Sequence, residues 1–413
     1  MDVVHARCAG LDVHKATVVG CVRGPGPHPN ARRGETKTFA STPRGLEALA
    51  AWLSAHGVTH VAMESTGVYW RPVYAVLEGA LALVLVLVNA RHVKMVPGRK
   101  TDVRDCEWLA QLLECGLLRG SFVPPQAVRD LRDLTRLRKT LIRERGQHVN
   151  RIAKTLELAH IKLGCVVTDL MGKTGRAILQ ALVAGIDDPE QLVACAQGSL
   201  RKKQAALREV VVGRMRPHYA FLLQQHLALI DTLDTHIATL DTRIEAAMVP
   251  FAEAAALAET MPGVATRAAQ AILAETGVDM DAFPTPEQFA SWARLCPGNN
   301  ESAGKRRPTT TGKGATWLRA TLQEAAWAAV KTKKSYYRAL FHRLKARGGP
   351  KKAIVAVQHA MLVALWHMLK HGVPHQDLGA DYFDRRNTGG RRRHHVRQLE
   401  ALGYQVLLVE DAA

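Results

Sequence analysis

Two acidic residues three positions apart, Asp102 and Asp105, stand out in segment 100–113 because their side chains could act together. Apolar residues recur there at helical spacing and Thr101 suits a capping position, which predicts a helix beginning near Asp102. Residues three apart share a helix face, with Cβ atoms roughly 5–6 Å apart. Charges that close repel unless a cation neutralises them, which indicates half of a metal site. The alternative is that Asp102 favours the helix N-terminus and Asp105 is solvated.

Two more carboxylates lie on segments that have the pattern of strands. Residues 8–23 alternate and are rich in valine, which predicts two strands, with Asp12 in the first. Residues 59–67 have the composition of a buried strand that ends on Glu64 and a turn of small residues. A carboxylate in a core strand is costly unless it is paired or bound to a metal. Both acids therefore need a partner.

The same part of the chain alternates between strands and helices. The pattern predicts a Pro/Gly-rich turn at 24–34, a strand at 36–42, a helix at 45–56, a strand at 59–64, a helix at 68–78 and a strand at 81–88. Elements in this order form an α/β unit with parallel strand pairing. Functional groups in such sheets collect at strand ends, which is where Glu64 lies.

Asp12, Glu64, Asp102 and Asp105 are therefore expected to converge at one edge of the predicted sheet. Four carboxylates suffice to hold two divalent cations about 4 Å apart, the arrangement that clamps the attacking and leaving oxygens in phosphoryl transfer. Ligation by oxygen alone favours Mg²⁺ over zinc, with Mn²⁺ as the second choice. The alternative for Asp12 is a satisfied core acid that pairs with a cation such as Lys15 or Arg91.

The composition favours a nucleic-acid partner. The 413 residues include 56 Lys plus Arg against 37 Asp plus Glu, for a formal net charge of +19. A polyanion is expected to balance that charge, nucleic acid before membrane. The seven cysteines form no CxxC pair, which indicates reduced thiols and excludes a disulfide framework. We therefore expect a soluble cytoplasmic protein, associated with the nucleoid, with no membrane partner.

The middle of the chain has the pattern of long helices. Residues 126–154 carry nine basic and three acidic residues while leucines keep helical spacing, which predicts a long basic helix. A second long helix is predicted at 218–247, with a heptad-like stripe that favours helix pairing or oligomerisation. That stripe consists of Leu222, Leu229, Leu233, Ile237, Leu240 and Ile244.

A tight Pro-Gly turn, Pro262-Gly263, follows a predicted helix at 251–260 and opens another that closes at Gly277. This order predicts a helix–hairpin–helix shape. Its turn amides and helix N-terminus suit a phosphate without reading bases. An ordinary corner between two helices would have the same pattern.

A loop of small residues at 295–304 carries Ser302 and is followed by Lys305, Arg306 and Arg307. Cations beside a serine can hold a scissile phosphate near its oxygen and stabilise the charge of the transition state. Ser302 is therefore a candidate nucleophile toward phosphorus, given a base or metal to activate it. The alternative is a serine that makes a turn or caps the backbone.

The segment 331–352 holds nine basic residues and no acidic one, with Tyr336 and Tyr337 among them, so it has the clearest pattern for binding a polyanion. Together with the serine loop and the basic helix, it supplies the predicted nucleic-acid contacts. These are Lys305, Arg306, Arg307, Lys313, Lys333, Lys334, Arg338, Arg136 and Arg143.

With these motifs in order, the chain resembles the DEDD-type insertion-sequence transposases of the 110/1111 family, which include the Piv-type DNA invertases. The matching segments are Leu11-Asp12-Val13-His14-Lys15, Met63-Glu64-Ser65-Thr66-Gly67, Lys100-Thr101-Asp102-Val103-Arg104-Asp105, Met261-Pro262-Gly263 and Asn300-Glu301-Ser302-Ala303-Gly304-Lys305-Arg306. Each is weak alone, but together they cover nearly the whole chain in family order.

The resemblance implies four parts. A RuvC/ribonuclease-H-like α/β domain at 1–122 binds Mg²⁺ through Asp12, Glu64, Asp102 and Asp105. A basic helical, coiled-coil linker at 123–250 serves oligomerisation, and a mostly helical transposase domain at 251–375 carries the helix–hairpin–helix and the nucleophile Ser302. A basic tail at 376–413 has no assigned role.

The resemblance also implies a recombinase that excises and inserts its own element. Its partners are double-stranded donor and target DNA and a structured guide RNA from the element, and its dimers assemble to tetramers. The first alternative is a Mg²⁺-dependent nuclease of the Holliday-junction kind, which needs the four acids but not Ser302. The second is a non-catalytic nucleic-acid-binding protein, which needs neither.

Overall fold

The computed structural model describes residues 2–28, 31–65, 67–80, 83–89, 105–296, 301–302, 304–306, 314–386 and 388–408. The chain divides into two compact units, Met1–Val123 and Pro124–Ala413. The first is a sheet with helices, and the second is almost entirely helical. This confirms an α/β N-terminal part followed by a helical part, while the finer predicted boundaries stay predictions.

The first unit is built on a five-stranded sheet in the order β3-β2-β1-β4-β5. Its strands are β1 (Cys8–Val13), β2 (Thr17–Pro25), β3 (Arg32–Ala40), β4 (His60–Glu64) and β5 (Val84–Val88). β1, β2 and β3 are joined antiparallel, whereas β1, β4 and β5 are parallel to one another. The parallel pairing predicted from the strand–helix order is confirmed for β1, β4 and β5.

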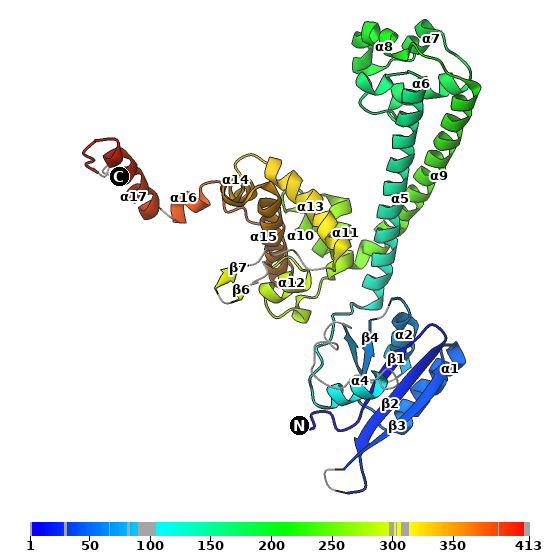
Figure 1. Ribbon diagram of the computed structural model, residues 1–413, viewed down its shortest axis with the longest axis vertical. Helices are drawn as coiled ribbons and strands as arrows, with labels where there is room; N and C mark the ends of the chain where they lie inside the picture. The colour runs from blue at the N-terminus through cyan, green and yellow to red at the C-terminus, as the bar shows by residue number, and fades with distance from the viewer. Residues whose placement is uncertain are drawn as a thin grey trace. The chain divides into compact units, whose positions relative to one another are not determined.

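Helices cover both faces of this sheet (Figure 1). On one face, α1 (Pro43–Ala55) and α2 (Trp70–Ala80) enclose a core that includes Leu11 and Met63, both fully buried. On the other face lies α4 (Asp105–Glu114), the described part of the helix predicted to begin near Asp102. The alternation of side chains along β1 assigns Leu11 and its neighbours to opposite layers.

β3 begins earlier than predicted, inside the segment expected to be a turn. Arg32 pairs with Pro25 and Gly34 with Arg23, so the hairpin is longer than the Pro/Gly pattern indicates. β3 is an edge strand whose middle residues are exposed, so it lacks the alternation of apolar side chains on which the prediction depends.

Two long helices form the spine of the second unit: α5 (Gln126–Leu158) and α9 (Pro217–Met248). They run antiparallel, because Arg138 near the start of α5 pairs with Asp241 near the end of α9, and Arg145 pairs with Asp234. The helices α6 (Lys173–Val183), α7 (Pro189–Ala194) and α8 (Gln204–Val211) pack around the other end of the pair.

The predicted apolar stripe on α9 is wrong in part. The buried residues are Leu223, Leu227, Ile230, Ile237, Ile244 and Met248, and Leu229 is exposed. They fall at alternating steps of four and three, and Asp234 and Asp241 occupy the two missing positions of that series. Because two seam positions are acidic and bind arginines of α5, a pattern of apolar residues alone placed part of the stripe on the wrong face.

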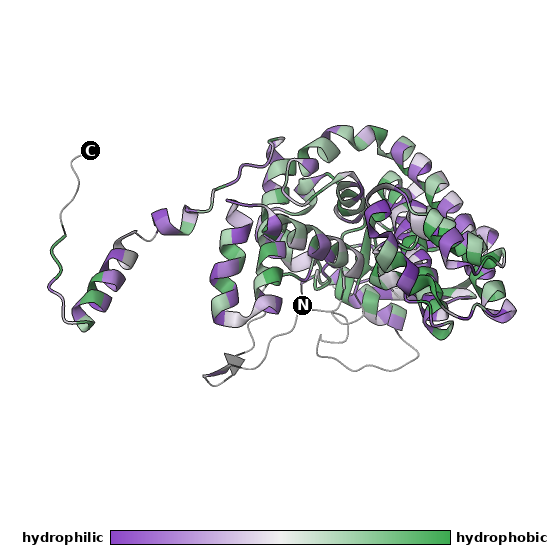
Figure 2. Ribbon diagram, turned by 90° about the horizontal axis from the view of Figure 1, so that it is seen from above, coloured by the Kyte–Doolittle hydropathy of each residue, from purple (hydrophilic) through white to green (hydrophobic). Residues whose placement is uncertain are grey.

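Most of the rest of the second unit is also helical: α10 (Ala252–Glu259), α11 (Thr266–Thr276), α12 (Pro286–Trp292), α13 (Thr316–Lys331), α14 (Tyr336–Gly348), α15 (Pro350–His371), α16 (Tyr382–Arg386) and α17 (Thr388–Ala401). Hydrophilic and hydrophobic residues are mixed along the helical ribbons of the protein (Figure 2). α15 is long and apolar enough to cross a membrane by length and composition, but it packs against α12, α13 and α14 and half of its apolar window is buried.

The two helices predicted on either side of the Pro-Gly turn are present as α10 and α11, and the structure explains the glycine between them. Gly263 has a φ of +84°, and a Cβ there would lie 2.2 Å from the carbonyl oxygen of Ala325 and 2.6 Å from the amide of Ala329. The turn therefore packs directly on the backbone of α13, which only glycine permits.

Candidate active site

Asp12 and Glu64 lie at matching positions on neighbouring parallel strands. Leu11 of β1 pairs with Met63 of β4. Asp12 is the residue after Leu11, and Glu64 is the residue after Met63. Leu11 and Met63 point into the α1/α2 core, so the two acids point to the opposite face of the sheet. Both acids are partly exposed. The sheet therefore places two carboxylates at the carboxyl end of its central strands.

The face to which these acids point is the face covered by α4. A Cβ on Gly10 would lie 2.2 Å from the carbonyl oxygen of Cys106 and 2.5 Å from the amide nitrogen of Ala110. The Cys8 thiol contacts the carbonyl oxygen of Ala110 at 3.5 Å. β1 and α4 therefore run in opposite directions. Asp105, the first residue of α4, consequently lies toward Asp12 at the end of β1.

The charges around Cys106 support this arrangement. Burial raises the pKa of the Cys106 thiol to about 11, and nearby negative charges, Asp12 among them, add to the rise. A carboxylate of β1 therefore lies within electrostatic range of the first turn of α4. The N-terminal end of a helix carries a partial positive charge, which stabilises acids gathered there.

Asp12 has a partner in the structure. Its Oδ2 lies 3.0 Å from Nε2 of His14, and the two side chains are 31% and 58% exposed. The end of β1 is therefore open to solvent at Asp12. The structure thus pairs Asp12 with His14 and not with Lys15, and the contact is an ion pair when His14 is protonated.

The acids fit a hard cation by donor type. Carboxylate oxygens are the ligands that Mg²⁺ prefers. Across the described ranges, no three His, Cys, Asp or Glu side chains already stand close enough together to hold a metal ion. Asp102, the fourth predicted ligand, lies outside the described residues. The structure thus brings Asp12, Glu64 and Asp105 to one face and one end of the sheet, and the four-acid cluster stays a prediction.

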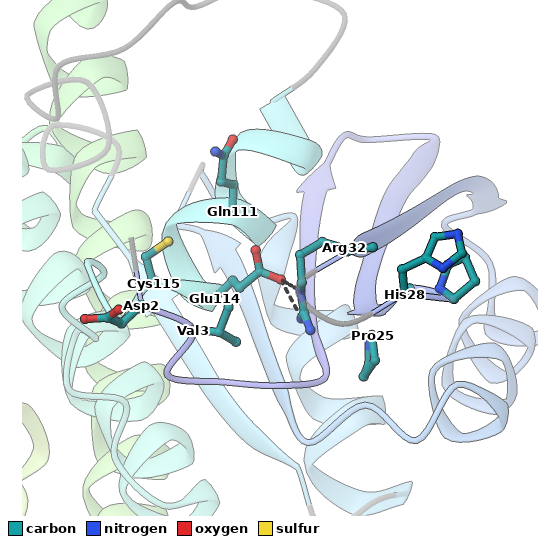
Figure 3. Close-up of a pocket in the computed structure, with 11 residues that line it drawn as sticks. Asp2, Val3, Pro25, His28, Arg32, Gln111, Glu114 and Cys115 are labelled. Atoms are coloured by element: carbon teal, nitrogen blue, oxygen red, sulfur yellow. Dashed lines mark hydrogen bonds and ion pairs between the residues drawn. The ribbon is translucent and has the colours of Figure 1, made fainter.

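At its other end α4 is tied down by Glu114, a residue the sequence reading did not single out. Its side chain is 5% exposed and binds Arg23 of β2 at 2.9 Å and Arg32 of β3 at 2.6 Å. Figure 3 shows Glu114 and Arg32 on the wall of an open cavity of about 960 Å³. A buried acid with two arginines fixes the position of the helix that carries Asp105.

Ser302 lies in the second unit, on a small hairpin. β6 (Glu301–Ser302) pairs with β7 (Lys305–Arg306), and Gly304 takes a φ of +72° in the turn between them. Ser302 is opposite Lys305, whose side chain is exposed. Of the predicted cations near the serine, Arg307 and Lys313 lie outside the described residues.

The two predicted contacts on α5 differ in their surroundings. Arg136 donates to both carboxylate oxygens of Glu275 at 2.7 and 2.8 Å, with the ring of Trp317 at 5.8 Å. Its charge therefore already has a partner inside the protein. Arg143 lines an open, mostly apolar cavity of about 750 Å³ formed by α5, α11 and α13. Nucleic-acid contacts by both residues stay predictions.

The remaining predicted contacts gather where α13 meets α14. Lys333 and Lys334 form an exposed turn, and Lys334 has a φ of +59°. Ser335 caps α14 by accepting a hydrogen bond from the backbone amide of Arg338 at 3.3 Å. The turn thus displays its cations on a fixed helix start and not on a long loop.

Comparison with known families identifies the class. Residues 9–161 match a transposase family model named for the DEDD transposases of IS110, and residues 255–342 match the transposase IS116/IS110/IS902 family. The two segments span more than half of the chain, so it is a DNA transposase, an enzyme of the recombinase class. It belongs to the IS110 family of insertion-sequence transposases, as the motifs predicted. No curated protein matches the chain significantly.

Proposed function

We propose that this transposase excises and inserts its own insertion sequence by Mg²⁺-dependent strand cleavage under the guidance of an RNA. One observation carries the proposal: Asp12 and Glu64 stand side by side on parallel strands beneath the start of the helix that carries Asp105. We assign the first unit to the RuvC/ribonuclease-H-like class on the same ground. The α5–α9 pair, with its heptad spacing, is the proposed coiled-coil linker.

In this proposal Asp12, Glu64, Asp102 and Asp105 hold Mg²⁺, with Mn²⁺ as a substitute. When bound, the ion neutralises charge on the scissile phosphate and positions it for in-line attack. The acids lie at the strand ends, where the site is open to solvent. The partial positive charge at the N-terminal turn of α4 reduces the electrostatic repulsion among them. Glu114 holds α4 in place from its other end.

Ser302 is the proposed nucleophile. Its Oγ attacks the phosphorus, a phosphoserine bond forms, and the deoxyribose oxygen of the cleaved strand leaves with a proton. Lys305, opposite Ser302 in the hairpin, offers a positive charge to the phosphate. We propose that the serine of one protomer joins the acids of another in a dimer that assembles to a tetramer.

The partners follow from charge. A net charge of +19 and the uninterrupted cations of 331–352 favour nucleic acid, with duplex DNA as substrate and the structured RNA as guide. The protein then works in the cytoplasm, at the nucleoid.

The test combines purified protein, the transcript of the element's own non-coding end, a donor–target DNA pair and Mg²⁺, and the junctions that form are sequenced. We expect recombined junctions with the wild type and none with Asp12→Asn or Ser302→Ala. Ser199→Ala, an exposed serine of the same unit, is the matched control and should recombine normally. Omitting the transcript should abolish the reaction.

Denaturing gels separate the alternatives. Under the proposal a covalent protein–DNA species accumulates with the wild type and disappears with Ser302→Ala. Cleavage that survives Ser302→Ala would identify a hydrolytic nuclease of the Holliday-junction kind. Binding without any cleavage, unchanged by Asp12→Asn, would identify a non-catalytic binding protein.

A further inference from the structure

Trp327, on α13, is a large aromatic side chain left in solvent. It is 40% exposed, whereas Trp52 and Trp366 are buried and donate their indole N–H to Glu35 and to the carbonyl oxygen of Phe283. Within the described part of the chain, no acceptor receives the indole N–H of Trp327. Within the described residues, hydrogen bonding therefore does not explain why a tryptophan stands at this position.

The ring of Trp327 is nevertheless held in place. It meets Phe341 of α14 edge-on, with centroids 5.4 Å apart and planes at 64°. Phe341 is buried between α14 and its neighbours, so it anchors one side of the indole. The contact fixes the ring while part of its surface stays open to solvent, so little conformational freedom is lost when a flat ligand stacks on it.

Three basic residues occupy helix positions one turn from Trp327 or from Phe341. Lys331 lies one turn after Trp327 on α13, while Arg338 and Lys345 lie one turn to either side of Phe341 on α14. Helix neighbours at these spacings share a face. Lys331 and Lys345 are exposed. The acid nearest on the same helix face, Glu324, already pairs with Lys139 at 3.2 Å.

We propose that Trp327 is a stacking platform for an unpaired nucleobase, with Lys331, Arg338 and Lys345 holding the phosphates of the same single strand. Aromatic rings combined with a basic surface bind single strands in this way, because every base offers a flat face for stacking. Bases inside a duplex are already stacked on one another and cannot use the platform. The ligand is single-stranded nucleic acid, either an opened DNA strand or an unpaired part of an RNA.

This proposal rests on the nucleic-acid role of the α13–α14 surface and not on the cleavage chemistry. It is therefore tested without Mg²⁺, by binding alone, so that its failure and a failure of the recombinase proposal can be told apart. The full-length protein is titrated, with anisotropy as the readout, into labelled 15-nucleotide strands of DNA and RNA, the same DNA with abasic positions, and a duplex.

Trp327→Leu keeps an apolar contact with Phe341 but removes the aromatic face. We expect it to weaken binding of both normal single strands by about 5- to 100-fold and to leave the abasic strand and the duplex unchanged. Trp327→Phe should retain most of the affinity. Phe221→Ala, another exposed aromatic of the same unit, is the matched control and should change nothing. The larger loss, on DNA or on RNA, identifies the natural strand.

The phosphate contacts have their own arm. Lys331→Gln should weaken binding of all four ligands and lower the slope of log affinity against log salt by about 0.7 for the single strands. The proposal is overturned if Trp327→Leu weakens the abasic strand as much as the normal one. It is also overturned if that variant changes only the oligomeric state, which would make this face a contact between copies of the chain.

Discussion

The carbonyl oxygen of Cys106 occupies the place where a side chain on Gly10 would begin. A Cβ on residue 10 would lie 2.2 Å from that oxygen, and the neighbouring contact to the amide of Ala110 is nearly as short. The distance between β1 and α4 therefore depends on the absence of a single carbon atom, and Asp12 and Asp105 are carried by these two elements.

Gly10→Ala is expected to displace α4 and to separate the acids. Overpacking of this kind typically costs about 1–3 kcal/mol, and the first unit should melt earlier by circular dichroism. Strand cleavage should be lost while DNA binding, which we propose depends on the second unit, is kept. Gly79→Ala in α2 is the control, because a Cβ there meets nothing within 4 Å. Full cleavage by Gly10→Ala would contradict the placement of Asp105 beside Asp12.

Glu114→Gln keeps the shape of the side chain but leaves two arginines without their anionic partner. Breaking a buried ion pair from one side typically costs about 3–5 kcal/mol, so thermal unfolding of the first unit should begin at a much lower temperature. Glu47→Gln, at an exposed position of α1, is the control and should unfold like the wild type. Equal melting of the two variants would show that the arginines find other partners.

The sequence predicted both strands: the one that carries Asp12 from its valine-rich alternation, and the one that carries Glu64 from its buried-strand composition. It did not predict how α4 lies across them. That arrangement depends on Gly10, and a single glycine in a strand is compatible with a bulge or a bend as well as with a helix packed on it. Predicting that the acids converge required only the strand order, whereas their distances depend on side-chain packing that no local pattern encodes.

The seam between α5 and α9 shows a second limit. Asp234 and Asp241 look like surface residues in the sequence, and only the arginines seven residues apart on α5 explain them. Arg138 and Arg145 in turn look like nucleic-acid contacts. The pattern of a single helix cannot predict ion pairs with residues far away in the sequence. Because Arg138 and Arg145 form such pairs, part of the positive charge of α5 stabilises the fold.

Removing Asp241 is expected to destabilise the protein more than removing Arg138, although the two side chains form one ion pair. Arg138 is 5% exposed and binds Asp241 at 2.9 Å and Gln270 at 2.7 Å, while Asp241 also binds Arg267 near the surface. Asp241→Leu strands a buried guanidinium and should cost about 3 kcal/mol, whereas Arg138→Met leaves Asp241 paired and should cost about 1 kcal/mol.

The double variant, Arg138→Met with Asp241→Leu, should recover most of the loss of Asp241→Leu, since apolar replacements of both partners suit a helix seam. Urea unfolding followed at 222 nm measures all three. Glu157→Gln, which removes an exposed ion pair with Lys162, serves as the control and should be neutral. Simple additivity of the two single variants would show that no coupling exists.

A histidine pair makes the long helices sensitive to acid. Nδ1 of His148 and Nδ1 of His226 are 3.2 Å apart, so at least one ring must be neutral to accept the hydrogen bond. Burial lowers the pKa of His226, and the nearby positive charges of His148 and Arg151 lower it further.

The pKa of His226 in the folded protein lies below its value of about 6.5 in the unfolded chain. At pH values between the two, the unfolded chain therefore binds more protons than the folded protein. The contribution of neutral His226 to the free energy of unfolding is therefore fully present above pH 6.5, and it is lost as the pH falls below 6.5 toward the folded pKa. Melting temperatures between pH 7.5 and 5.5 should decrease in the wild type and decrease less in His226→Gln. His236→Gln, at an exposed position of the same helix, should keep the wild-type slope. A steeper slope for His226→Gln would reverse the argument.

Cysteine labelling measures how firmly α4 is held. Burial raises the pKa of Cys106 to about 11 and that of Cys8 to about 12, so both thiols are protonated and covered at pH 8, whereas Cys165 is exposed. Only thiolates react quickly with iodoacetamide, so mass spectrometry should find Cys165 labelled well before Cys106 and Cys8. In Gly10→Ala, Cys106 should be labelled much earlier, because the displaced helix uncovers it. If Cys106 is labelled as fast as Cys165 in the wild type, α4 opens freely and cannot hold Asp105 against the sheet.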